Sequence, residues 1–182
     1  ETTWMSCASS ANNGYGGAAR RTPITLVVGL GNPILGDDGI GWRVAEAVRS
    51  LEPHVEVDCL ALGGLSLMER LVGYERVIIV DSIQTRDGRN GQVYSFALED
   101  LPDLSAGHTT AAHDTSLQTA LKMGRAMGAK LPDEVYVVGV EAERVYDFSE
   151  ELTPQVAAAI PEATQAVVEL LNSRESTPEP GE

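Results

Sequence analysis

The chain is poor in cysteine and in aromatic residues. Its 182 residues include two cysteines, Cys7 and Cys59, so no framework of disulfides is expected to staple the fold. This usage fits a reducing compartment, and Cys59, which lies in an apolar stretch, is expected to be an inert core residue. Aromatic residues make up 5% while glycines number 18, a balance that favours an α/β sheet protein over an all-β sandwich.

Positive charge and long apolar runs are scarce as well. Thirteen Lys and Arg residues stand against 27 Asp and Glu residues, and the net charge of −14 disfavours binding to nucleic acid or to an anionic membrane surface. No segment approaches the ~20 apolar residues of a membrane span, and the first residues lack the basic-then-apolar pattern of a secretory signal. We therefore expect a cytoplasmic protein.

Both ends of the chain differ in composition from the middle. Residues 1–22 are rich in Gly, Ala, Ser and Asn without periodicity, and residues 173–182 hold two prolines and three glutamates. We expect two disordered tails around a single folded domain at residues 23–172.

Apolar runs alternate with helical patterns inside this domain. Strands are predicted where the runs are continuous, at 24–29, 55–60, 76–81 and 134–141. Helices are predicted from apolar residues at helical spacing, at 40–51, 65–72 and 115–128. This alternation predicts an α/β fold, a three-layer sandwich in which a twisted, five-stranded, mostly parallel sheet has helices on both faces.

Two further elements complete this prediction. The segment 91–96 follows a short polar loop, and we expect it to be an antiparallel strand that returns as in a hairpin. A last helix is expected to be capped by Thr153, to have Pro154 in its first turn and to be kinked or split at Pro161.

Polar residues gather where the carboxyl ends of the predicted strands should lie, which is where open α/β sheets form their sites. The first cluster, at 29–39, reads GLGNPILGDDG. Its first two glycines match a dinucleotide-binding loop, but Ile34 occupies the third small position and two carboxylates would repel a pyrophosphate. One function that remains open is that of a regulatory, non-catalytic module that binds an anion or nucleotide at this loop.

Two neighbouring aspartates in this cluster are expected to differ in role. Asp37 is expected to cap the following helix, because a carboxylate accepts the free N–H groups of a first turn. Capping does not require a second carboxylate, and the surrounding glycines leave room for a bulky partner, so a functional role is favoured for Asp38. Asp81 ends a buried strand, where a carboxylate requires hydrogen bonds, a paired charge or a metal.

Histidine supplies the remaining candidate ligand. His113 stands just before a predicted helix, His108 is a rival in the same loop, and His54 is expected at the surface at the other end of the sheet. Asp38, Asp81 and one imidazole form a ligand set that suits Ni, Zn, Fe or Mn. The residues alone thus indicate a metal or acid–base site of the Asp/Asp/His type.

These segments carry a resemblance to a known family. GLGNPILGDDGIGWRVAEAV, at 29–48, resembles the first signature of the [NiFe]-hydrogenase maturation proteases. VIIVDSI, at 77–83, looks like their second, a hydrophobic strand that ends in Asp, and AAHDTSL, at 111–117, like their third, a His just before a helix. Order and spacing agree across about residues 24–171. Between the first and second signatures, the segment 61–66 (ALGGLS) keeps the family's glycine turn but lacks the family's acidic and threonine residues. This difference bears on substrate specificity.

The resemblance implies an endopeptidase of aspartic or metal-assisted type. It would remove a short C-terminal extension from the nickel-loaded precursor of a [NiFe]-hydrogenase large subunit, its protein partner. Asp38, Asp81 and His113 would contact the metal, and Asp38 would be the catalytic residue. The nickel would be supplied by the precursor as the recognition element, and the protease is expected to be a monomer. A related peptidase that holds its own metal is a further alternative.

Overall fold

The structure, a computed structural model, describes residues 24–100, 112–143 and 148–173. The tail expected at 1–22 lies outside these ranges, as do Cys7, His108 and all but the first residue of the tail expected at 173–182. The predictions that concern them therefore stay predictions. Within the described residues, no helix is both long enough and apolar enough to cross a membrane.

The described residues form one mixed sheet, with the strands in the order β2-β1-β3-β5-β4. Its strands are β1 (Thr25–Leu30), β2 (Glu56–Leu60), β3 (Arg76–Ile83), β4 (Val93–Ala97) and β5 (Glu134–Glu141). All neighbours pair in parallel except β4 and β5, which are antiparallel. The predicted mostly parallel sheet is confirmed.

The partner of β4 differs from the hairpin that the sequence suggested. β4 is antiparallel, as predicted, but it pairs with β5 and not with β3. β5 lies between them and pairs with β3 along eight residue pairs. The burial of the strands explains this order. β5 is buried along most of its length and suits the interior of the sheet, whereas every side chain of β4 is at least partly exposed and suits the edge.

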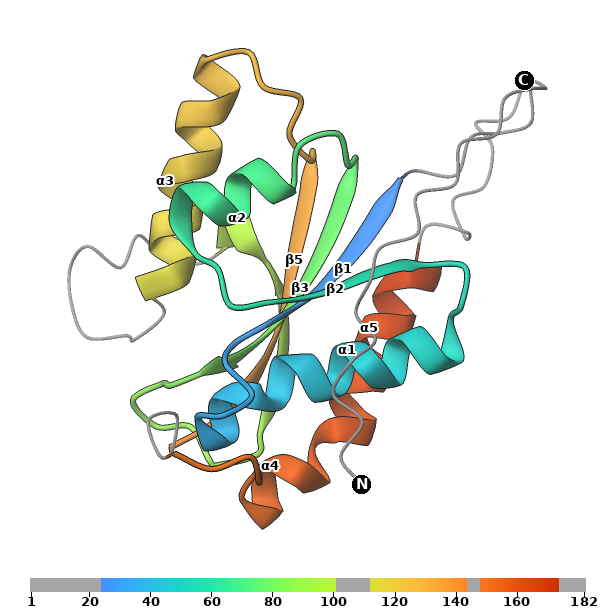
Figure 1. Ribbon diagram of the computed structural model, residues 1–182, viewed down its shortest axis with the longest axis vertical. Helices are drawn as coiled ribbons and strands as arrows, with labels where there is room; N and C mark the ends of the chain where they lie inside the picture. The colour runs from blue at the N-terminus through green and yellow to red at the C-terminus, as the bar shows by residue number, and fades with distance from the viewer. Residues whose placement is uncertain (1–23, 101–111, 144–147, 174–182) are drawn as a thin grey trace.

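Helices cover both faces of the sheet, as predicted (Figure 1). The helical segments are α1 (Ile40–Leu51), α2 (Gly64–Arg70), α3 (Ala112–Ala126), α4 (Pro154–Ala158) and α5 (Ile160–Asn172), with short 3-10 turns η1 (Gly36–Gly39) and η2 (Leu98–Asp100). Alternate residues of β3 face opposite layers: Ile78 and Val80 pack with α1 and α5, while Val77 and Ile79 pack with α2 and α3.

Glycines bring α1 into backbone contact with β1. A Cβ at Gly29 would lie 2.3 Å from the Gly41 carbonyl oxygen, and a Cβ at Gly41 would lie 2.2 Å from the Leu30 oxygen. No side chain larger than hydrogen fits between the helix and the strand at these positions. The glycine pattern of this segment therefore serves close packing of α1 on β1, and this packing fixes the turn that carries Asp38.

The crossovers place a crevice at the carboxyl ends of β1 and β3. The chain leaves β1 through α1 on one face and reaches β3 through α2 on the other, which is the arrangement that opens a site in α/β sheets. The 15-residue α3 ends shortly before β5 begins and runs back along the sheet for about 22 Å. Its first turn, which includes His113, thus lies toward the same end.

The C-terminal helix is split, as Pro161 predicted. α4 ends at Ala158, and α5 begins at Ile160 with Pro161 in its first turn, where a missing N–H is tolerated. Thr153 occupies the N-cap position of α4, but its side chain makes no capping bond to the helix. Its hydroxyl is used elsewhere, in a contact with Asp37.

Candidate active site

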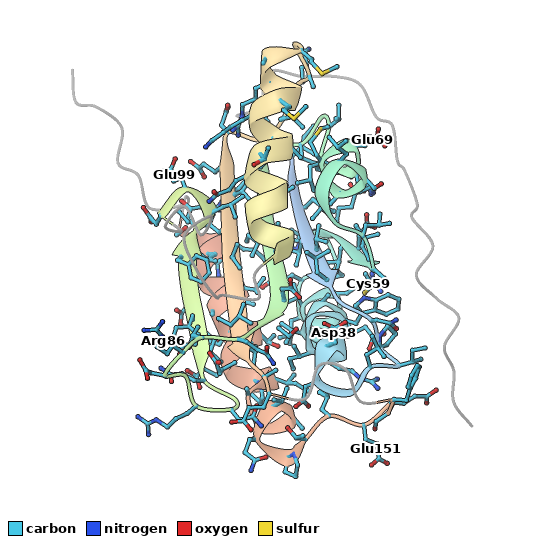
Figure 2. The ribbon with its side chains drawn as sticks, turned by 90° about the vertical axis from the view of Figure 1, so that its left-hand side faces the viewer. Asp38, Cys59, Glu69, Arg86, Glu99 and Glu151 are labelled. Carbon is cyan, nitrogen blue, oxygen red and sulfur yellow. The ribbon has the colours of Figure 1, made fainter. Side chains whose placement is uncertain are left out.

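Asp38 lies on η1, in the connection between β1 and α1, and its carboxylate accepts a hydrogen bond on each oxygen. Oδ2 accepts the Asn32 backbone N–H at 2.6 Å, and Oδ1 accepts the Ser82 hydroxyl at 3.2 Å. The residue is partly exposed, and Figure 2 shows it at the amino-terminal end of α1. Water and a ligand can therefore reach this carboxylate while its orientation is fixed from two sides.

Asp81 lies near the end of β3 and is 7% exposed. Its Oδ1 accepts the backbone N–H of Ser82 at 2.8 Å. Asp38 and Asp81 line one hollow of about 200 Å³, together with Leu30, Gly31, Asn32, Ala61 and Leu62. The structure thus brings together the two carboxylates that the sequence singled out, 43 positions apart in the chain (81 minus 38).

The histidines are placed differently from one another. His113 is the second residue of α3, which begins three residues earlier than predicted, and its side chain lies outside what the structure describes. A role for its imidazole therefore stays a prediction. His54 is exposed at the opposite end of α1, with its Nε2 3.6 Å from Glu52 Oε2, which confirms it as a surface residue.

Asp37 does not cap the helix that follows it, so that prediction is wrong. Neither η1 nor α1 has a side-chain capping bond. The Asp37 carboxylate is fully buried and instead accepts the Thr153 backbone N–H at 2.6 Å and the Thr153 hydroxyl at 2.9 Å. Asn90 donates to the same hydroxyl oxygen at 3.3 Å. Asp37 therefore ties the turn of Asp38 to the start of α4.

A second tie holds the same turn from the backbone. Leu35 forms a β-bridge with Ser149, the Gly36 N–H donates to the Ser149 oxygen at 2.7 Å, and the Ser149 N–H donates to the Ile34 oxygen at 3.1 Å. The prediction from sequence missed this contact, because nothing local in the segment 148–150 points to a partner more than 100 residues earlier.

A third buried carboxylate, Glu141 at the end of β5, was also missed. It is 4% exposed and accepts the Thr85 N–H at 2.7 Å and the Thr85 hydroxyl at 2.9 Å. The signal was present, since Glu141 ends an apolar strand in the way that Asp81 does. Its two donors fix the loop after β3, which gives it a structural role.

The chemistry of the hollow follows from its two carboxylates. Two like charges that line one small space repel unless a cation lies between them, and carboxylate oxygens are good ligands for divalent metals. Among the side chains that the structure describes, no group of three or more His, Cys, Asp or Glu residues is placed to hold a metal. The described part of the site is thus a pair of oriented carboxylates, suited to share a cation or to activate water.

Comparison with known proteins assigns the fold to a family. The family model described as hydrogenase maturation protease (HycI) matches residues 43–170, which include Asp81 and His113 and begin after Asp38. The hydrogenase 2 maturation protease of Escherichia coli K12 is 31% identical over 149 residues, covering 80% of this chain and 89% of that protein. The hydrogenase expression/formation protein HupD of Rhizobium leguminosarum is 27% identical over 154 residues, covering 83% and 75%.

Solved structures agree with this assignment. The hydrogenase maturating endopeptidase HybD of Escherichia coli superposes with a TM-score of 0.69 at 28% identity, covering 82% of this chain and 93% of that one. The [NiFe] hydrogenase maturation protease HybD of Thermococcus kodakarensis gives a TM-score of 0.63 at 25% identity, covering 81% and 98%. The chain belongs to the hydrogenase maturation protease family, and it is an endopeptidase of that family.

Proposed function

We propose that Asp38, Asp81 and His113 contact the nickel that the precursor already carries, and that this contact places the scissile peptide bond against the protease. The shared hollow of Asp38 and Asp81 is the observation that carries the proposal. The position of His113 in the first turn of α3, toward the same end of the sheet, supports it. The nickel is part of the substrate, and the protease supplies oxygen and nitrogen ligands from one side.

Burial distinguishes the two carboxylates in this scheme. Asp81 is buried, whereas Asp38 is partly exposed, so a water molecule reaches Asp38 more readily. Asp38 takes a proton from that water as the water oxygen attacks the scissile carbonyl carbon. The proton then passes to the leaving amine as the C–N bond breaks, which balances the hydrolysis. The precursor's nickel polarises the peptide and orients it during this step.

Nickel then acts as a checkpoint for processing. Without the cation, the precursor meets two carboxylates on a chain of net charge −14 and has no group that bridges the two proteins. With the cation, the carboxylates and the precursor's own ligands share one ion. The protease works as a monomer in the cytoplasm in this proposal, and the precursor is its partner.

The test is cleavage of purified precursor, read by mass spectrometry as the loss of a C-terminal peptide. Nickel-loaded precursor should be cut, and nickel-free precursor should stay intact. Asp38→Asn, Asp81→Asn and His113→Ala should each stop the cut, whereas the surface controls Asp87→Asn and His54→Ala should process normally. Full processing by all three site variants would overturn the proposal. Stoichiometric zinc in the purified protease would favour a peptidase with its own metal instead.

A further inference from the structure

The last buried apolar residues of β3 divide between the two faces of the sheet. Ile79 packs with α2 and α3, and Val80 packs with α1 and α5. Because successive side chains of a strand alternate between the two faces, Asp81 lies on the same face as Ile79, and Ser82 lies on the same face as Val80. Asp81 is thus directed toward the layer of α3, and Ser82 toward the start of α1.

Ser82 contacts both carboxylates of the hollow. Its backbone N–H donates to Asp81 Oδ1 at 2.8 Å, and its hydroxyl donates to Asp38 Oδ1 at 3.2 Å. The hydroxyl comes from β3, whereas the other donor to Asp38 is the Asn32 backbone N–H, which belongs to the loop after β1. Ser82 therefore links the Asp38 carboxylate, in the connection after β1, to the Asp81 carboxylate on the neighbouring strand β3.

We propose that Ser82 is a positioning residue for the cleavage, whose hydroxyl turns the Asp38 carboxylate into the hollow that it shares with Asp81. This inference rests on the proposed function of those two residues. The terminal torsion of an aspartate has a broad energy profile, so a lone carboxylate rotates easily. Donors on both oxygens define its plane, and each oxygen keeps a free lone pair for water or a cation.

The size of the effect follows from metal sites of similar build. Groups that hydrogen-bond a ligating carboxylate typically change metal affinity by about 10- to 100-fold when they are removed. Ser82→Ala removes the hydroxyl and keeps the backbone N–H that orients Asp81. Ser82→Thr keeps a hydroxyl on the same carbon and adds a methyl group that a strand tolerates. These two variants separate the hydrogen bond from the bulk of the side chain.

The experiment uses the full chain under single-turnover conditions, with the protease in excess over nickel-loaded precursor. The protease concentration that gives half of the maximal rate reports formation of the complex, and the maximal rate reports the chemical step. Ser82→Ala should raise the half-saturating concentration about 10- to 100-fold, because the nickel contact forms before cleavage. Ser82→Thr should stay near the wild type. Ser95→Ala, at an exposed serine of β4, is the matched control and should change neither value.

Two results would overturn the inference. Ser82→Ala could match the wild type in both values, or Ser82→Thr could raise the half-saturating concentration as far as Ser82→Ala does. Asp38→Asn and Asp81→Asn in the same assay separate this inference from the proposed function. If they cleave normally, the proposed function fails. If they are inactive and Ser82→Ala is normal, the role of Ser82 alone fails. Urea unfolding of each variant confirms that the fold is intact.

Discussion

Replacing Asp37 should damage stability far more than chemistry, although its neighbour Asp38 is the proposed catalytic group. Asp37 is fully buried and accepts two hydrogen bonds from Thr153, across 116 positions of the chain. Asp37→Ala removes the acceptor and leaves the backbone N–H and the hydroxyl of Thr153 without it. The turn of Asp38 then loses its side-chain tie to α4.

The magnitude follows from these two bonds. A hydrogen bond to a charged group contributes about 1.5–3 kcal/mol, so losing both gives about 3–6 kcal/mol. A neighbouring cavity of about 250 Å³, lined by Asp37 and Thr153 among others, lets water reach the abandoned donors and favours the lower end. We expect a loss of about 3 kcal/mol, which lowers the melting temperature of a domain of this size by about 6–12 °C. Thr153→Ala, which keeps the backbone N–H, should lose about half as much.

Urea unfolding followed by circular dichroism measures these differences for Asp37→Ala, Thr153→Ala and the double variant. The double variant should lose less than the sum of the two, because the variants share one bond. Asp38→Ala is the matched control, and it should lose less stability, since water can replace its donors at a partly exposed site. Below its unfolding transition, Asp37→Ala should still cut precursor, while Asp38→Ala should not. A stable but inactive Asp37→Ala would refute this division of roles.

Three further predictions concern packing, a buried carboxylate and pH. Gly41→Ala should lower the free energy of unfolding by at least about 1–3 kcal/mol in urea, because its Cβ would lie 2.2 Å from a backbone oxygen of β1; an unchanged midpoint would mean that α1 is not fixed by this contact. Glu141→Gln should lose about 2 kcal/mol in the same assay, since an amide cannot accept on both sides, and a neutral effect would exclude a structural role. Burial, and secondly a hydrogen bond to Glu56, raise the pKa of Tyr74. The folded protein then keeps a proton that the unfolded chain loses, so stability should fall as the pH rises above about 10, more in the wild type than in Tyr74→Phe. Urea titrations at alkaline pH measure this, and an equal loss of unfolding free energy with pH in the wild type and in Tyr74→Phe would contradict it.

The predictable part of the fold is the part that local pattern determines. The interior strands are continuous apolar runs, and the split of the last helix follows from the chemistry of Pro161. The place of β4 was not predictable in this way. β4 could pair with β3 only if β5 did not. Which of the two strands pairs with β3 is a property of the whole sheet.

The same limit explains which parts of the site were predicted. Asp38 and Asp81 follow strands whose carboxyl ends must lie together, so the sequence predicted their neighbourhood. The role of Asp37 depends on Thr153, and the role of Ser82 depends on which face of β3 meets η1. Neither relation leaves a periodic or spacing signal, because each joins segments that approach only after the layers have packed.

We propose that carboxylates of the protease become ligands of a metal that the precursor brings. X-ray absorption at the nickel edge measures this directly on nickel-loaded precursor, alone and after rapid freezing with protease. Wild-type protease should add oxygen or nitrogen ligands to the nickel, and Asp38→Asn and Asp81→Asn should each reduce that gain. A nickel spectrum that is the same with and without bound wild-type protease would contradict the account.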